Sequence, residues 1–155
     1  MPPIMLKIIG KLAILAVLSV NIGVVSTGIW VAHELKGGPA KIQLRELTDQ
    51  EKWHLHLYEE TLRVGLPYKD FRILKRIAEA ESHFEQYDEN GSVLREFINH
   101  KDVGIFQINE GYHLATSREL GINIYEPEGN IDYAVYLYKR DGSVHWNWSK
   151  QNWSK

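Results

Sequence analysis

Two short segments decide how this chain folds: Ala80-Glu81-Ser82-His83-Phe84, and Asp102-Val103-Gly104-Ile105-Phe106-Gln107-Ile108-Asn109. The first ends a stretch in which apolar residues recur at helical spacing, with Asp70 as the expected N-cap. The second combines glycine with polar residues, which is typical of a backbone that lines a cleft. Together they predict a helix that carries a carboxylate to the wall of a cleft.

Glu81 is the candidate general acid. On a helix, Phe71, Leu74, Ala78 and Glu81 share one face, whereas Glu79 lies on another. A carboxylate at the end of an apolar face loses water, so its pKa should rise toward neutral pH. The alternative is a carboxylate at a helix end that turns out to water. The helical pattern taken alone favours the carboxylate that turns out to water.

Three motifs follow one another along the chain. They are Glu81-Ser82-x-Phe84, then Gly104-Ile105-Phe106-Gln107-Ile108-Asn109, and then Asn130-Ile131-x-x-Ala134-x-Tyr136-Leu137. In this order they make residues 50–148 resemble the soluble lytic transglycosylase (SLT) domain family of the lysozyme-like superfamily. The resemblance implies a mainly α (α+β), lysozyme-like fold with a small β element. Phe106 and Ala134 stand where the family usually has Met and Gly.

The resemblance also implies an activity, which is lytic cleavage of the MurNAc–GlcNAc bond in peptidoglycan glycan strands. Glu81 would first protonate the glycosidic oxygen and then act as base on the sugar's own primary hydroxyl, closing an anhydro-MurNAc ring. The nucleophiles belong to the substrate, so no metal and no cofactor is implied. The expected substrate-binding residues are Ser82, Gly104, Phe106, Gln107, Asn109, Tyr136, Tyr138 and Trp148.

Two other functions stay open. A lysozyme-type muramidase would hydrolyse the same bond and would need a second carboxylate, for which Asp102 and Asp88 are candidates. Asp102 beside Gly104 is, however, typical of a turn. A non-catalytic cell-wall-binding or envelope-scaffold protein is the other possibility, and Glu81 at the motif position favours an enzyme over it.

The C-terminal part departs from the family, whose Ala-Tyr-Asn-Ala-Gly loop has no counterpart here. Tyr138 is the candidate for the family's substrate-contacting tyrosine. The side chains of Trp146, Trp148 and Trp153 either stack on pyranose rings or close the core. For Trp146 the core position is favoured, and for Trp148 both positions stay open.

The whole chain has 155 residues, no cysteine and a formal net charge of −2. Disulfides and thiolate metal sites are therefore excluded, and no basic surface for nucleic acid is implied. We expect three parts: an N-terminal membrane anchor or signal peptide (residues 1–36), a linker (37–47) and a lysozyme-like transglycosylase domain (48–155). Protein partners cannot be named from the sequence.

Lys7 and Lys11 precede an uncharged apolar run from Leu12 to Ala32. About 20 apolar residues suffice for a helix to span a bilayer. The flanking charges predict a transmembrane helix with the following domain outside the cytoplasmic membrane. A cleaved signal peptide, with Ser26-x-Gly28 as the cleavage site, is the alternative. Both alternatives place the domain in the cell envelope or beyond it, and we favour the uncleaved anchor.

Further elements are expected from caps and breakers. Thr48-x-x-Glu51 predicts a helix start, and Gly65 the end of that helix. A short helix over 114–120, an N-cap at Asn130, and a strand or irregular arm over 93–99 complete the expected elements.

Overall fold

The computed structural model describes residues 22–25, 28–31 and 43–155. The chain forms two compact units, Met1–Thr48 and Asp49–Lys155. The expected linker over 37–47 lies in large part outside the described residues.

The described part of the first unit is a three-stranded antiparallel sheet in the order β1-β2-β3. Its strands are β1 (Ile22–Val25), β2 (Gly28–Val31) and β3 (Gln43–Arg45). The sequence predicts one helix from Leu12 to Ala32, and for the described residues of this run the prediction is wrong, because they form the β1–β2 hairpin. β-Branched residues, which favour strands, make up much of both segments. The rest of the run lies outside the described residues, among which no helix is both long and apolar enough to cross a bilayer.

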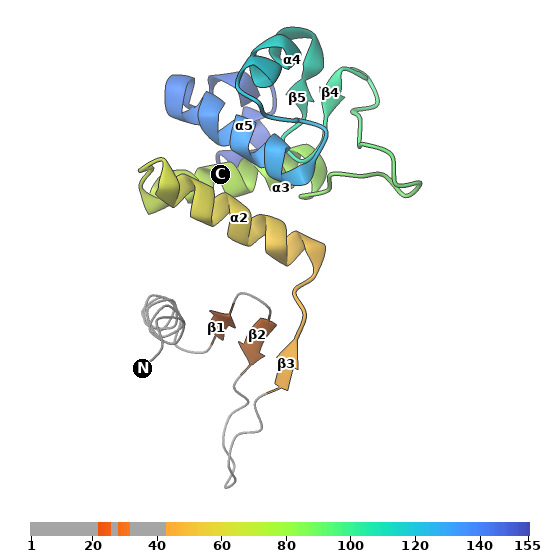
Figure 1. Cartoon of the computed structure of the whole chain (residues 1–155). Coiled ribbons are helices and arrows are strands. Elements are labelled where there is room, and N and C mark those ends of the chain that lie inside the picture. The colour runs from red at the N-terminus through yellow and green to blue at the C-terminus, as the bar shows by residue number, and fades with distance from the viewer. Residues whose placement is uncertain (1–21, 26–27, 32–42) are drawn as a thin grey trace, which may run out of the picture. The chain divides into compact units, whose positions relative to one another are not determined.

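The second unit is mainly helical with a small β element, which confirms the expected class. Its elements are α2 (Asp49–Arg63), α3 (Tyr68–Ser82), β4 (Asp102–Val103), β5 (Ile108–Asn109), α4 (Glu110–Glu119), α5 (Pro127–Asp141), the 3₁₀ helix η1 (Gly142–Trp146) and α6 (Lys150–Trp153). In Figure 1, α2 runs alongside α5, and β4, β5 and α4 lie at the end of this unit away from α2. The strands β4 and β5 are antiparallel.

The start of α2 after Thr48 and its end before Gly65 confirm the expected limits. Gly65 has a φ of +78°, which glycine adopts without strain, and Leu66 N–H donates to the Thr61 carbonyl at 2.9 Å.

Helix α3 begins earlier than the sequence predicts. Pro67 is its N-cap, and Asp70 lies inside the first turn. Asp70 instead accepts a hydrogen bond from the Tyr138 hydroxyl at 3.1 Å, so a tertiary contact uses the side chain that was expected to cap. Leu74, Ile77 and Ala78 are fully buried, which confirms the inner face of this helix.

Two other helix starts also differ from expectation. Helix α4 begins at Glu110, directly after β5, and not at residue 114. Helix α5 begins at Pro127, whose ring fits the first turn of a helix, and Asn130 lies inside α5 as a fully buried residue. The end of α4 before Gly121, with its φ of +72°, is as expected.

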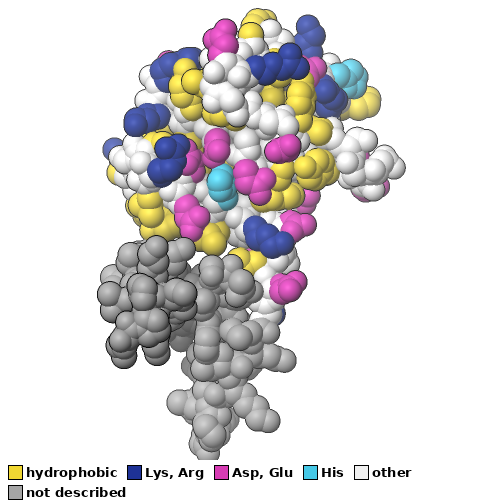
Figure 2. All heavy atoms as spheres, in the orientation of Figure 1, with side chains coloured by type: hydrophobic (Ala, Val, Ile, Leu, Met, Phe, Trp, Pro, Cys, Tyr) yellow, Lys and Arg dark blue, Asp and Glu magenta, His cyan; other side chains and the backbone are white. Residues whose placement is uncertain are grey.

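An irregular arm joins α3 to β4. It forms isolated bridges, Tyr87 with Val93 and Arg95 with Val103, and no regular strand over 93–99. Its first residues turn back into the core, because Phe84 adopts a φ of +65° and is fully buried. In Figure 2, which shows one face, acidic and basic side chains of the described residues are interspersed with apolar ones.

Candidate active site

A cleft of about 620 Å³ opens in the second unit. Its walls come from the end of α3, the arm, β4 and β5, the start of α4, and the segment from α5 to α6. The lining residues are Ala80, Glu81, Glu96, Ile98, Asn99, Asp102, Gln107, Ile108, Asn109, Tyr112, His113, Leu137, His145, Trp146, Trp148, Ser149 and Asn152. Four of the nine sequence-predicted site residues are therefore in it: Glu81, Gln107, Asn109 and Trp148.

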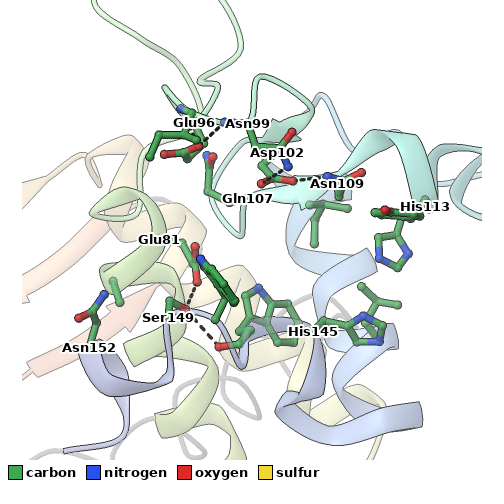
Figure 3. Close-up of a pocket in the computed structure, with 17 residues that line it drawn as sticks. Glu81, Glu96, Asn99, Asp102, Gln107, Asn109, His113, His145, Ser149 and Asn152 are labelled. Carbon is green, nitrogen blue, oxygen red and sulfur yellow. Dashed lines mark hydrogen bonds between the residues drawn. The ribbon is translucent and has the colours of Figure 1, made fainter.

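Glu81 reaches the cleft from the last turn of α3 (Figure 3). Burial raises the pKa of its carboxyl, and the negative charges of Asp102 and Glu96 raise it further. The hydroxyl of Ser149 donates a hydrogen bond to Glu81 Oε1, and this bond lowers the pKa of the carboxyl. The carboxyl is half-buried, and the balance of these effects favours a protonated Glu81 at higher pH than for an exposed glutamate.

Asp102 lies on β4, on the side of the cleft opposite to Glu81 in Figure 3. Asn109 Nδ2 donates to its Oδ1 at 2.6 Å, and Asn99 Nδ2 donates to its Oδ2 at 2.8 Å. Each carboxylate oxygen thus accepts an amide hydrogen, which fixes the orientation of the group. The sequence favours a turn position for Asp102, whereas the structure places it on β4 and in the cleft wall.

Glu96 contributes a third acidic side chain from the arm. Its Oε2 accepts the backbone N–H groups of Ile98 and Asn99, at 2.8 and 2.5 Å. This pair of bonds holds the tip of the arm at the mouth of the cleft. Asp88, the other carboxylate considered from the sequence, does not line the cleft and caps a turn in the arm through Asn90 and Ser92 N–H.

Gln107 lines the cleft in a conformation that residues with side chains seldom adopt, with a φ of +47°. Its Nε2 donates to the Gly104 carbonyl at 2.7 Å, so the amide ties two parts of the same loop. Its Oε1, like Asn109 Oδ1, is a buried acceptor without a hydrogen-bond partner among the described residues. Residues in such sparsely populated conformations cluster at functional sites.

Three sequence-predicted site residues lie beneath the cleft and not in its lining: Ser82, Gly104 and Phe106. The Ser82 hydroxyl donates to the Ile105 carbonyl at 2.7 Å, which ties α3 to the β4–β5 loop. Phe106 is fully buried, and its N–H donates to Asn130 Oδ1 at 2.8 Å. These residues support the site from the core.

Gly104 has a φ of +70°, and a Cβ built on it would lie 2.4 Å from Gln86 Oε1 and 2.6 Å from Asn130 Nδ2. The sequence predicts that glycine is needed here for the approach of a ligand. Instead, glycine admits two buried amide side chains, which bond to the backbone of Ile105 and Val103.

Tyr136 and Tyr138 also lie away from the cleft lining. The Tyr138 hydroxyl is held by Asp70, and burial, reinforced by this contact, raises its pKa to about 12. Tyr136 packs against Tyr133 and lies under the Arg140 guanidinium, 5.4 Å from its ring centre. Neither contact is with a residue that lines the cleft.

Two of the three C-terminal tryptophans, Trp146 and Trp153, lie in the core, and the third, Trp148, is exposed. Trp146 is 4% exposed, donates from Nε1 to the Phe106 carbonyl at 3.0 Å and forms part of the cleft floor. Trp153 is buried and donates to the Trp146 carbonyl at 3.1 Å. Trp148 is fully exposed at the cleft, so its ring is free to stack on a sugar.

Sequence reasoning missed several lining residues, among them Ser149, His113 and His145. The two histidine rings lie 5.2 Å apart, and burial together with the charge of His145 lowers the pKa of His113. Asp141 Oδ2 lies 2.8 Å from His145 Nε2. No pattern in the sequence places Ser149 beside Glu81, because the two residues belong to segments distant in the chain.

No group of three or more His, Asp or Glu side chains suited to a metal ion occurs within the described residues. Comparison with protein-family models, with curated proteins and with solved structures finds no match to this chain. The family resemblance therefore rests on the three motifs alone.

Proposed function

We propose that the second unit is a lytic transglycosylase with a lysozyme-like fold that cleaves the MurNAc–GlcNAc bond of peptidoglycan glycan strands. The observation that carries the proposal is Glu81 in its cleft: a half-buried carboxyl whose pKa is raised by burial, at the family's motif position. A general acid is most effective when its pKa lies near the working pH.

In the proposed reaction, Glu81 donates its proton to the glycosidic oxygen as the bond from that oxygen to the anomeric carbon breaks. The 2-acetamido oxygen of the sugar bonds to the anomeric carbon and stabilises its positive charge. The Glu81 carboxylate then takes the proton of the C6 hydroxyl while O6 attacks the anomeric carbon and the acetamido oxygen leaves. The products are an anhydro-MurNAc end and a free hydroxyl on the leaving sugar, without consumption of water.

This chain's residues support three parts of this proposal. Ser149 donates to Glu81 Oε1, which leaves the other carboxyl oxygen to carry the proton. Trp148 offers an exposed aromatic face for a sugar ring. Gln107 and Asn109 supply amide groups along the same wall.

Hydrolysis by a muramidase is the second candidate, and one observation favours it. Asp102 lines the same cleft, and its charge acts on Glu81. Paired carboxyl groups that flank the scissile bond are the usual equipment of glycosidases that use water. A negative charge at Asp102 would stabilise the positive anomeric carbon or orient the attacking water.

The test is digestion of purified peptidoglycan in water enriched in oxygen-18, followed by mass spectrometry of the fragments. We expect anhydro-MurNAc ends without the heavy oxygen. Reducing ends that carry oxygen-18 would show hydrolysis and would replace the first proposal by the second. Lack of cleavage by the parent protein, with binding retained, would indicate a wall-binding or scaffold protein.

We propose further that the domain works in the cell envelope, outside the cytoplasmic membrane, either anchored or secreted. The support is the lysine-flanked apolar run from Leu12 to Ala32 in the sequence. Protease treatment of intact cells should degrade the domain if it is anchored. A domain that is retained in the cytosol and protected from protease would contradict the proposal.

A further inference from the structure

A second hollow, of about 330 Å³, adjoins the cleft. It is lined by Asn99, Lys101, Asn109, Gly111 and Tyr112. Asn99, Asn109 and Tyr112 also line the cleft, so a strand in the cleft can extend into the second hollow without leaving the surface.

The two hollows differ in charge. Glu81, Glu96 and Asp102 line the cleft, whereas Lys101 is the one Lys or Arg in either lining. An anionic group on a bound strand is therefore attracted toward Lys101.

The ammonium group of Lys101 has no hydrogen-bond or ion-pair partner among the residues that the structure describes. Glu110 is the acid whose pKa Lys101 helps to lower, but its carboxylate is already engaged. Arg95 donates to both Glu110 oxygens, at 3.0 and 3.1 Å, and the Tyr125 hydroxyl donates at 2.8 Å. The donors of Lys101 thus stay available for a ligand.

Gly111 keeps the hollow open between Lys101 and Asn109. A Cβ built on Gly111 would lie 3.2 Å from Lys101 Cδ and 3.1 Å from Asn109 Oδ1. A larger residue would push against both side chains. Tyr112 stands at the rim, 83% exposed, and its ring offers an apolar face beside the cation.

We propose that this hollow, the Lys101 subsite, binds a saccharide unit that carries a carboxylate. Tyr112 stacks on the sugar ring and Lys101 pairs with the carboxylate. The inference rests on the proposed function, since it takes the ligand to be a glycan strand. In peptidoglycan the carboxylate belongs either to the lactyl group of a muramoyl unit without peptide, or to the stem peptide of a substituted unit.

Lys101 favours a carboxylate in the second hollow, which shares Asn99, Asn109 and Tyr112 with the cleft. The subsite would therefore select strands by an acidic substituent, in addition to the sugars at the scissile bond.

The experiment is an NMR titration of the full chain with three disaccharides. These are GlcNAc–MurNAc with a free lactyl carboxylate, its uncharged methyl ester, and the same disaccharide with a dipeptide on the lactyl group. We expect at least one charged ligand to bind about two- to fivefold more tightly than the ester, as for a solvent-exposed ion pair. Chemical-shift changes on binding should include the backbone amides of Lys101 and Tyr112. The difference in affinity between the charged ligands and the ester should vanish near 1 M salt.

Lys101→Gln should abolish this difference between charged ligands and ester, whereas Lys69→Gln, the same charge change on exposed Lys69 of α3, should keep it. Tyr112→Ala should weaken all three ligands, and Phe97→Ala, an exposed aromatic outside both linings, should weaken none. Preference for the free lactyl ligand or for the dipeptide ligand identifies the source of the carboxylate.

Equal affinity of the parent protein for the ester and both charged ligands would overturn the subsite, as would a preference that survives in Lys101→Gln. Cleavage is measured in parallel on whole strands. A parent protein that cleaves strands without charge preference refutes the subsite alone, and one that binds with charge preference but does not cleave refutes the proposed function alone.

Discussion

Glu81 on α3 and Asp102 on β4 line one cleft but are held in different ways. Glu81 is half-buried and accepts one hydroxyl donor, from Ser149, and burial raises its pKa. Asp102 accepts an amide N–H at each oxygen, from Asn99 and Asn109. The comparison teaches that two chemically similar groups in one cleft differ through their surroundings. Burial raises the pKa of Glu81, whereas hydrogen bonds at both oxygens fix the orientation of the Asp102 carboxyl.

The largest effect should come from Glu81→Gln, which keeps the shape of the side chain but removes its proton. We expect turnover of peptidoglycan to fall by about 10²–10⁴-fold. Glu79→Gln is the matched control, since Glu79 lies on another face of α3, is exposed, and contacts His54 at 3.4 Å. An active Glu81→Gln with an inactive Glu79→Gln would refute the assignment of the acid.

The same variant tests the raised pKa through stability. The folded pKa of Glu81 lies above its unfolded value, so its contribution to stability is full below the unfolded pKa and is lost as pH rises through the folded pKa. Glu81→Gln should therefore gain thermal stability relative to the parent at neutral and higher pH, and the gain should shrink at acidic pH. Thermal melting of both proteins across pH measures this, and a gain that is largest at acidic pH would contradict it.

Asp102→Asn separates the two proposed reactions. For a transglycosylase we expect less than about tenfold loss of turnover, with anhydro ends retained, because the second carboxylate is not obligatory. The alkaline limb of the pH–rate profile should move to lower pH, because the negative charge that raises the pKa of Glu81 is gone. A loss of about 10²-fold or more would instead favour hydrolysis.

Ser149→Ala should move the same limb in the opposite direction. The Ser149 hydroxyl lowers the pKa of Glu81, so its removal raises that pKa and extends activity to higher pH. Turnover at the optimum should fall a few-fold, roughly the 1 kcal/mol of one hydrogen bond, as the carboxyl loses its fixed orientation. If Ser149→Ala and Asp102→Asn shift the alkaline limb of the pH–rate profile in the same direction, the opposite effects assigned to Ser149 and Asp102 on the pKa of Glu81 are wrong.

The smallest effect on turnover should come from Trp148→Ala, which should act on KM. Loss of about 1 kcal/mol of stacking would raise KM by roughly fivefold and leave the melting temperature unchanged, since the side chain is 100% exposed. Trp146→Ala, 4% exposed, should instead destabilise the fold by about 3–5 kcal/mol. Equal losses of stability in both variants would contradict the division between rim and core.

The position of Glu81 at the end of the inner face of α3 follows from one helix, whose face is set by Leu74, Ile77 and Ala78. The helical pattern alone, however, favours a carboxylate turned out to water, and the structure instead places Glu81 half-buried in a cleft. The mainly helical class and the small β element are expected from the family resemblance, and the core position favoured for Trp146 agrees with its burial. The starts of α3 and α5 are not, because Asp70 and Asn130 have the chemistry of caps but are used in tertiary contacts.

The rest of the site depends on contacts that no local pattern records. Asp102 is oriented in the cleft by hydrogen bonds from Asn99 and Asn109. Ser149 lies beside Glu81 because the chain returns to α3 after η1. The glycine at position 104 is required by two buried amide side chains, those of Gln86 and Asn130. From the sequence alone, this cause cannot be distinguished from the close approach of a ligand. The β1–β2 hairpin shows that an uncharged apolar run does not by itself fix a helix.

The bond from Ser149 to Glu81 joins residues 68 positions apart in sequence, and that from Trp146 to Phe106 spans 40. Contacts of such long range form late in folding, because closing a long loop costs entropy before the contact is made. During synthesis, Glu81 emerges well before the segment that covers it and stays hydrated, with an ordinary pKa and ionised at neutral pH. If Glu81 is the acid, as proposed, the chain acquires it only when folding of this unit is complete, and a partly made or partly unfolded molecule should lack the proposed activity.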